Sequence, residues 1–205
     1  MNSFPNKIPV FPLSGVIYFP KTNLPLNIFE ERYLNLVDDA VRKDKLMGMI
    51  QPTGKGNDVY KIGCLGKIND YQKSNDGRIL INLTGLTRFE VLEEVENSNL
   101  YREFKVIYKK FDNDLKPSSE DVNTEILMEK SRTFFKKNGL LLNWKEFEKL
   151  DETQKINTLS MIAPVTNEEK QKLLEALTLN EKIKTLKDII NFYLHEVNFS
   201  NQTVQ

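Results

Sequence analysis

The sequence offers few side chains that could serve as a nucleophile, a general base or a metal ligand. It holds one histidine, His195, and one cysteine, Cys64, in 205 residues. A protein metal site needs several convergent Cys, His or carboxylate ligands, and a catalytic thiol needs a base such as histidine near it. With one residue of each type, we find no pattern typical of either kind of site. We therefore expect no metal, no cofactor and no catalytic residue.

Both residues have simpler interpretations. His195 lies toward the end of the last helix-like segment, where a positive charge interacts favourably with the helix dipole, so we expect it to be solvated. Its neighbour Glu196 leaves the alternative that the two are half of a metal site completed by another protein molecule. Cys64 stands in the strand-like string IGCLG of residues 62–66, where a small buried residue is expected.

Nucleotide and acyl-transfer chemistry lack their sequence motifs. A phosphate-binding loop ends in Gly-Lys-Ser/Thr at the start of a helix, because backbone N–H groups and the lysine must meet the phosphates. The nearest strings are GKG at 54–56, which lacks the hydroxyl residue, and GKI at 66–68, which lies in a strand pattern. No Gly-x-Ser-x-Gly elbow is present, and Ser14 stands in a proline-bounded loop. We expect the protein not to be an enzyme.

Nucleic-acid binding has one weak candidate surface. Basic residues and phenylalanines interleave in one segment, namely Lys130, Arg132, Phe134, Phe135, Lys136 and Lys137. Glu125 and Glu129 precede them on the same expected helix, so we interpret the segment as a solvated face carrying ion pairs. Up to residue 116 the sequence holds 17 basic and 15 acidic residues (+2), and after it 12 and 14 (−2). Binding through phosphates requires a basic excess, so we do not expect nucleic acid as a partner.

Composition places the sequence among globular proteins. With 40% hydrophobic and 28% charged residues it should fold, and a single cysteine favours a reducing compartment, since it forms no intrachain disulfide. No run of roughly 18 apolar residues predicts a membrane span. We expect a cytoplasmic protein with no membrane partner.

The first half of the sequence has the pattern of a rolled sheet. Strands are expected at 8–11, 24–28, 46–51, 60–72, 78–83, 86–96 and 102–111. The first is expected to be an edge or irregular strand, because prolines 9 and 12 cannot donate ladder hydrogen bonds. The string SNDG at 74–77 predicts a hairpin turn. One helix is expected at 29–43, with a buried face made of Phe29, Tyr33, Leu36, Val37 and Ala40.

The second half has the pattern of consecutive helices. A polar stretch at 113–117 marks the expected boundary. The first helix is predicted to begin at a Ser118 or Ser119 cap and to end at Asn138-Gly139. Capping signatures that begin at Asn143, Asp151 and Thr166 predict three more helices, and a last helix follows. The predicted fold is α+β, with a β-rich domain over residues 1–116 and a helical bundle over residues 117–205.

A dense proline and aromatic segment is left unexplained by these elements. It reads FPLSGVIYFP over residues 11–20 and LPLNIFEERY over residues 24–33. It resembles the opening signature of the Lon substrate-binding domain family, in which FPL, FP and LPL-x-IFE-x-RY follow in order. The resemblance continues through IGCLGKI at 62–68 and from DGR at 76–78 into LTGLTRF at 83–89, and it is looser in the helical half. Glu31 departs from the proline that the family often has there, and both residues suit the first turn of a helix.

The resemblance implies a fold and a role. In Lon proteases this region precedes an ATPase module and a Ser-Lys peptidase domain, and it contributes to substrate engagement and assembly. It implies a pseudouridine-synthase-and-archaeosine-transglycosylase-like (PUA-like) β-barrel or rolled sheet with one helix, followed by a helical bundle, in a stand-alone bacterial member without the two catalytic domains. We therefore expect a non-catalytic protein- or peptide-recognition module, accessory to proteolysis or protein quality control. The expected partners are unfolded or partly folded protein segments, or a protease or chaperone; the alternative is RNA, which some PUA-like folds bind.

Two hypotheses concern particular residues. We expect the binding surface around residues 11–26, where prolines deny ladder hydrogen bonds and hold apolar groups on irregular backbone, and we predict Tyr18, Phe19 and Leu24 as binding residues. The alternative is that these side chains plug the end of the barrel. The structural motif residues of the family are Glu30, Arg32, Tyr33, Gly85 and Arg88. Among them we expect Arg88 to reach Glu30 from the sheet.

Overall fold

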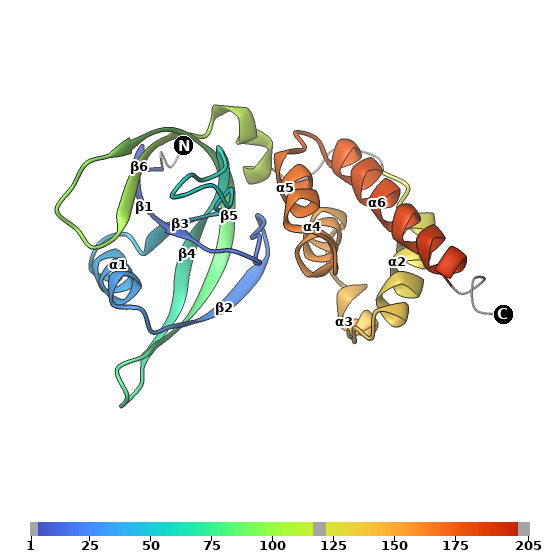
Figure 1. The fold of residues 1–205 in the computed structure, drawn as a ribbon, viewed down its shortest axis with the longest axis horizontal. Coiled ribbons are helices and arrows are strands. Elements are labelled where there is room, and N and C mark those ends of the chain that lie inside the picture. The colour runs from blue at the N-terminus through green and yellow to red at the C-terminus, as the bar shows by residue number, and fades with distance from the viewer. Residues whose placement is uncertain (1–3, 117–121, 201–205) are drawn as a thin grey trace. The chain divides into compact units, whose positions relative to one another are not determined.

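The computed structural model describes residues 4–116 and 122–200, with side chains up to residue 195. The protein divides into two compact units, Met1–Pro117 and Ser118–Gln205. Figure 1 shows that the first unit is a rolled sheet with one α-helix and the second is helical. The predicted α+β class is therefore confirmed.

The sheet of the first unit closes on itself through one long strand. Its strands are β1 (Lys7–Pro12), β2 (Asn23–Ile28), β3 (Leu46–Ile50), β4 (Ile62–Lys73), β5 (Ile79–Val95) and β6 (Arg102–Ile107). They lie in the order β2-β5-β4-β3-β1-β6, and the end of β5 pairs with β6 as well. The segments predicted at 78–83 and 86–96 are confirmed as strand, but the break predicted between them is wrong, because β5 runs through both. Register shifts in its pairings with β4 and β6 let it bend around the barrel.

β1 lies between β3 and β6, so the edge alternative of the prediction is wrong, whereas its interrupted pairing fits the irregular alternative. It pairs with β6 through residues 7–10 and with β3 through residues 10–12, so Val10 alone has partners on both sides. Pro9 therefore has a neighbour only in β6, and Pro12 only in β3. At each proline, one side of β1 has no paired strand. A missing N–H is tolerated at such positions.

Three further predictions for the first unit concern a turn, the end of a strand and the start of a helix. The predicted hairpin turn is confirmed, since Gly77 N–H donates to the Ser74 carbonyl at 3.1 Å with φ at 86°. β6 ends at Ile107 rather than at residue 111, and a 3-10 helix, η1 (Lys109–Leu115), follows. The helix α1 (Glu31–Arg42) starts after Phe29, which is 66% exposed, so the prediction that Phe29 belongs to its buried face is wrong.

The core of the first unit lies inside the rolled sheet, around Phe89 of β5. Phe89 is fully buried with apolar residues of β1, β4 and β6, such as Ile8, Leu65 and Phe104. The ring lies so close to β4 that a Cβ added to Gly63 would be 2.5 Å from its Cζ atom. Glycine at this position therefore lets the aromatic ring fill the barrel.

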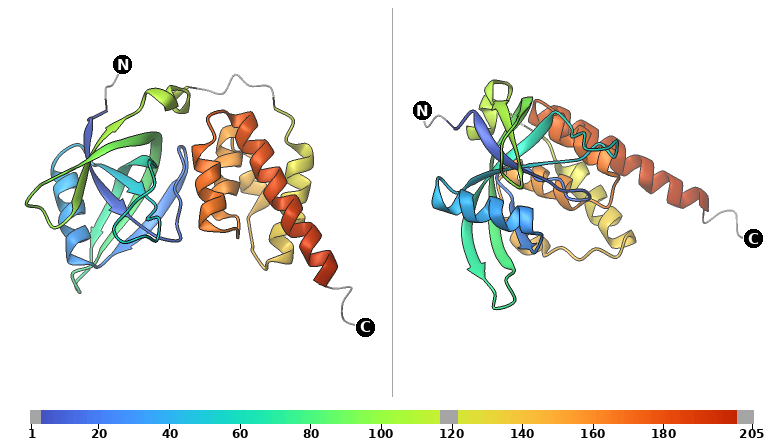
Figure 2. Two further views of the ribbon diagram at one scale, coloured as in Figure 1. Left: turned by 45° about the horizontal axis from the view of Figure 1, so that its top comes forward. Right: turned by 60° about the vertical axis from the view of Figure 1, so that its left-hand side comes forward.

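The second unit is a bundle of five described helices. They are α2 (Glu125–Lys137), α3 (Trp144–Phe147), α4 (Glu152–Ile162), α5 (Asn167–Glu175) and α6 (Leu179–Ser200). The caps predicted at Asn143, Asp151 and Thr166 are confirmed, and the last two form complete capping boxes. The predicted caps Ser118 and Ser119 lie outside the described residues, and Thr124 precedes α2. The long helix α6 runs past α2, α4 and α5 and buries Leu186 and Ile190 (Figures 1 and 2).

Candidate functional site

A cavity of about 400 Å³ opens in the first unit beside the start of α1. Its volume falls in the range of roughly 300–1,000 Å³ that is typical of ligand pockets. The end of β1, the first turn of α1, the loop 51–60, the loop 96–101 and the start of β6 contribute side chains. Its lining residues are Pro12, Arg32, Tyr33, Pro52, Gly56, Asn57, Val59, Leu100, Tyr101 and Arg102.

Arg32 and Tyr33 form one wall of this cavity. Glu30 holds the Arg32 guanidinium, accepting from Nε at 3.0 Å and from Nη2 at 2.7 Å, and the guanidinium lies 4.5 Å from the centre of the Tyr33 ring. That ring packs on Phe11 with 3.9 Å between centroids, and Tyr33 is only 5% exposed. Arg32 keeps about half of its side chain in solvent. Glu30 therefore holds the Arg32 guanidinium against the Tyr33 ring.

Arg102 also lines the cavity and ties the loop 51–60 to β5. Its Nε and Nη2 donate to the two oxygens of Glu94, both at 2.6 Å, and its Nη1 donates to the Asn57 carbonyl at 2.8 Å. The same pairing holds the pKa of the Glu94 carboxyl below its usual range, chiefly through the hydrogen bond from Arg102. Because Asn57 belongs to the loop 51–60, Arg102 anchors that loop to the barrel.

Tyr101 holds the loop 96–101 to α1. Its hydroxyl donates to Asp39 at 2.8 Å, and the Tyr101 side chain is buried while its neighbour Leu100 is 59% exposed. Burial, followed by the hydrogen bond to Asp39, raises the pKa of Tyr101 well above its usual range. A second cavity of about 470 Å³ shares Leu100, Tyr101 and Arg102 with the first. Leu100 is therefore an exposed apolar side chain that lines both cavities.

The pKa of Tyr33 is affected by the charged groups around the cavity. Burial is the largest effect and raises the pKa of the Tyr33 hydroxyl; the Arg32 guanidinium lowers it, Glu30 raises it and Arg102 lowers it. Both guanidinium groups therefore act on the same hydroxyl. Arg32 and Arg102 thus bring two cations to the lining of the cavity. The carboxylates that pair with them, Glu30 and Glu94, are not part of this lining.

The predicted binding residues lie mostly in the core. Tyr18 is 2% exposed and Phe19 is fully buried, whereas Leu24 is half-buried in β2, opposite Leu83 of β5. Burial favours the alternative that Tyr18 and Phe19 plug the barrel. A binding role for these three residues stays a prediction, and only Leu24 has side-chain surface to offer.

Gly85 has a structural role beside this plug. Its N–H donates to the Thr22 carbonyl and its carbonyl accepts from Lys21 N–H, both at 2.9 Å. A Cβ at this position would lie 2.2 Å from the Phe19 carbonyl oxygen. The close approach of two backbones explains why glycine stands here.

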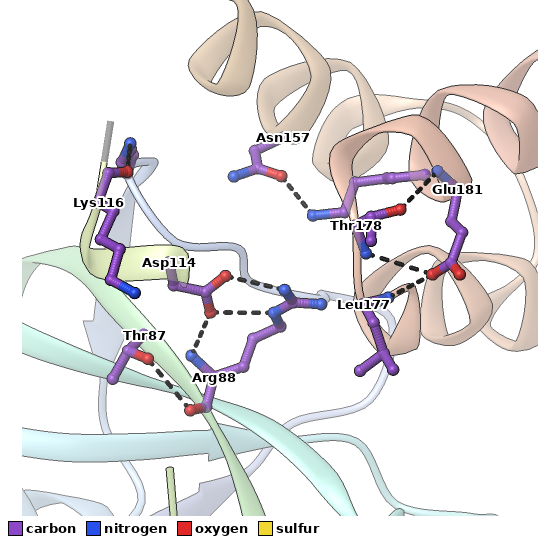
Figure 3. A network of polar contacts seen from close by, with 10 residues as sticks. Thr87, Arg88, Asp114, Lys116, Asn157, Leu177, Thr178 and Glu181 are labelled. Atoms are coloured by element: carbon purple, nitrogen blue, oxygen red, sulfur yellow. Dashed lines mark hydrogen bonds and ion pairs between the residues drawn. The ribbon is translucent and has the colours of Figure 1, made fainter. Parts of the chain in front are cut away.

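The predicted pairing of Arg88 with Glu30 is wrong. Asp114 of η1 accepts from the Arg88 guanidinium at 2.8 and 3.0 Å and from the Arg88 backbone N–H at 2.9 Å (Figure 3). Glu30 binds its neighbour Arg32 instead. The Arg88 and Asp114 side chains are 4% and 9% exposed, and the guanidinium packs over the Phe111 ring at 4.4 Å. The 3-10 helix that the strand prediction missed supplies the carboxylate.

The sequence patterns did not indicate seven of the ten residues that line the cavity. Arg32 and Tyr33 belong to the expected motif, but the sequence pattern places Val59, Leu100 and Arg102 only in loops or strands. One signal was present in the sequence: Leu100 follows the polar segment 97–99, where an apolar side chain is not needed for a core.

Other candidate chemistries find little support in the described residues. Cys64 is fully buried and His195 is exposed, as predicted. Phe134 and Phe135 are buried too, so the basic segment of α2 presents no stacked aromatic surface. No group of three or more His, Cys, Asp or Glu side chains within the described ranges could hold a metal ion. None of the helices described in residues 4–116 and 122–200 is long and apolar enough to cross a membrane.

Comparison with known proteins identifies one family whose model matches most of the chain. The family model for the ATP-dependent protease La (LON) substrate-binding domain matches residues 7–191, and so extends well into the helical unit. A Lon protease of Syntrophus aciditrophicus is 28% identical over 206 residues, covering 93% of this chain and 25% of that protein. A Lon protease of Bacillus thuringiensis is 25% identical over 203 residues, again 93% of this chain and 25% of that protein. The sequence thus spans about a quarter of the length of these relatives.

Two solved structures share the fold. The crystal structure of a Lon N-terminal domain protein from Xanthomonas campestris matches with a TM-score of 0.65 and 22% identity, covering 88% of this chain and 96% of that one. The N-terminal domain of a Lon protease from the Mycobacterium avium complex matches with a TM-score of 0.63 and 14% identity, covering 90% and 98%. The succession of rolled sheet and helical bundle is therefore common to these proteins.

Proposed function

Because the chain belongs to the Lon substrate-binding domain family, we propose that it is a recognition module that binds exposed segments of other proteins and performs no chemistry of its own. Its clients are unfolded or partly folded proteins, and it serves as an accessory to proteolysis or protein quality control in the cytoplasm. The observation that carries this proposal is the cavity beside α1, whose walls include the motif residues Arg32 and Tyr33.

The chemistry of the cavity fits protein segments. Proline, valine and leucine side chains supply apolar surface, while two arginines supply hydrogen-bond donors at its walls. Concave sites with apolar surface and a few placed polar groups are typical of ligand binding. Leu100, 59% exposed at the rim, adds an apolar contact that a folded core does not need.

RNA binding is the alternative. The balanced charge of both halves disfavours it, because phosphate contacts require a basic surface. The burial of Phe134 and Phe135 also disfavours base stacking on α2. A sub-micromolar affinity for RNA that falls steeply with salt would support the alternative.

Substitution of Leu100 tests the proposal. We expect Leu100→Ser to weaken binding of unfolded casein several-fold, since it removes apolar surface from the rim, and to leave thermal stability nearly unchanged, because the side chain is exposed. Leu92→Ser is the matched control, since Leu92 is 58% exposed on β5 and lines neither cavity. Fluorescence anisotropy with labelled casein gives the affinities. Equal binding by both variants and the wild type would remove the cavity from the proposal.

The absence of catalysis is tested separately. We expect the purified 205-residue protein neither to hydrolyse ATP nor to cleave casein, because no phosphate-binding motif or catalytic dyad is present in its sequence. Turnover that co-purifies with the monodisperse protein would contradict this part of the proposal.

A further inference from the structure

The wall of the cavity carries positive charge without negative charge. Arg32 and Arg102 line it, whereas Glu30 and Glu94, which hold the two guanidinium groups, are absent from the lining. Arg32 also lies in the first turn of α1, where the positive end of the helix dipole adds to its charge. An anionic group entering the cavity therefore meets two cations before it meets a carboxylate.

The two arginines differ in what they can still bind. Arg102 uses all three of its side-chain nitrogens on Glu94 and the Asn57 carbonyl. Arg32 donates from Nε and Nη2 to a single oxygen, Glu30 Oε2, and its Nη1 has no hydrogen-bond partner among the described residues. Arg32 therefore offers a ligand one nitrogen with both N–H donors unused, whereas Arg102 keeps only the second N–H of Nη1 and of Nη2 and acts mainly through its charge.

Besides the arginines, Asn57 and two tyrosines, the lining has an apolar part. Pro12, Pro52, Val59 and Leu100 contribute surface with no side-chain hydrogen-bonding groups. A ligand that fills the cavity must place an apolar group against these residues and an anionic group against Arg32. In a protein segment, this combination is a carboxylate beside an aliphatic or aromatic side chain.

We propose that the cavity selects protein segments in which a carboxylate follows an apolar side chain, and that Arg32 determines this selectivity. The inference rests on the proposed function, because it names the class of client that the same cavity accepts. The carboxylate belongs to an aspartate or glutamate side chain or to the C-terminus of a polypeptide. A planar guanidinium binds either with paired N–H donors.

A nucleic-acid phosphate fits the cavity less well. Glu30 and Glu94 lie directly behind the two guanidinium groups and repel a chain of repeated negative charges, whereas one carboxylate meets mainly the exposed cations. The apolar lining also has no counterpart in a sugar-phosphate backbone. The observations therefore favour a peptide.

Three short peptides labelled with tetramethylrhodamine test the inference by anisotropy titration against the 205-residue protein. The first contains Leu-Asp in a neutral Gly-Ser context and is amidated, the second replaces Asp with Asn, and the third carries its only carboxylate at a C-terminus that follows Leu. We expect the Asp peptide to bind about tenfold more tightly than the Asn peptide, as for a hydrogen bond to a charged group. Preference for the third peptide over the Asp peptide would support the inference and identify the terminal carboxylate as the source.

Substitution of Arg32 assigns the selectivity. We expect Arg32→Gln to abolish the difference between the Asp and Asn peptides and Arg32→Lys to retain part of it, since lysine keeps the charge without the planar donors. Arg78→Gln is the matched control: Arg78 is 55% exposed like Arg32 and also pairs with an acidic residue two positions earlier. Thermal unfolding of each variant checks the fold.

The outcomes separate this inference from the proposed function. Equal affinity of the wild type for the Asp and Asn peptides, or equal losses in Arg32→Gln and Arg78→Gln, would overturn the inference and leave the casein result with Leu100→Ser untouched. Displacement of the Asp peptide by a short oligouridylate at comparable concentration would overturn it in favour of RNA. A failure of the proposed function itself would appear as unchanged casein binding by Leu100→Ser.

Discussion

At the scale of single residues, the arginine–carboxylate pairs of this protein differ sharply in burial. The pair Arg88–Asp114 is almost wholly buried, whereas Arg78–Asp76 is more than half exposed on both sides. Removing one partner of a buried pair leaves an uncompensated charge, so we predict that Asp114→Ala lowers the free energy of unfolding by about 3 kcal/mol. Asp76→Ala is the control and should cost less than about 1 kcal/mol. Urea denaturation measures both, and equal effects would show that the Arg88 site is not a structural anchor.

Tyr18 gives a second prediction at this scale. Burial raises the pKa of its hydroxyl far above the ordinary 10.0, and that hydroxyl has no hydrogen-bond partner in the described structure. A raised folded-state pKa contributes stability below pH 10, and this stability is lost as the pH rises beyond 10 because the unfolded protein ionises first. We predict that Tyr18→Phe gains about 1 kcal/mol at neutral pH, since it removes an unsatisfied polar group, and loses stability less steeply above pH 10. Denaturation across this pH range measures both effects, and a loss of stability at neutral pH would contradict them.

At the scale of elements, the junction of β2 and β5 depends on a close contact of two backbones. The segment that follows Phe19 is held to Gly85 by two backbone hydrogen bonds. We predict that Gly85→Ala destabilises the protein by about 3 kcal/mol, because the new Cβ would clash with the Phe19 carbonyl and force the strands apart. Gly54→Ala is the control, since Gly54 has φ of 78° but open space around it, and it should cost about 1 kcal/mol. Thermal unfolding separates the two, and a mild effect of Gly85→Ala would mean that the barrel end adapts.

At the scale of the whole molecule, we predict that the domains 1–116 and 117–205 fold independently. Each exceeds the roughly 40 residues below which a domain usually needs extra cross-links, and each has its own buried core. Expressed alone, the first should unfold cooperatively and bind casein as well as the 205-residue protein does, because all residues that line the cavity belong to it. Circular dichroism and anisotropy measure folding and binding. Loss of binding in a folded first domain would assign part of the site to the second.

The sequence alone determined the features that depend on neighbours along the backbone. Capping residues predicted the starts of α3, α4 and α5, and the turn at 74–77 predicted the β4–β5 hairpin, because caps and turns are set by side chains within a few residues. The proline and aromatic strings indicated the family, which the match over residues 7–191 bears out. Buried Cys64 and exposed His195 also followed from local pattern.

Only the tertiary structure decided the features that depend on residues far apart in the sequence. Pro9 and Pro12 predicted an edge or irregular strand, yet β1 lies between β3 and β6. The prolines are tolerated there because the two ladders of β1 overlap at Val10 alone. Arg88 found Asp114 rather than Glu30 because η1, which strand patterns did not predict, brings the carboxylate to it. Arg32 and Arg102 line the same cavity although they are 70 positions apart in the sequence. Spacing patterns within one strand or one helix turn do not predict such pairs. Closure of the barrel by β5 sets these distances, and closure is a property of the whole sheet.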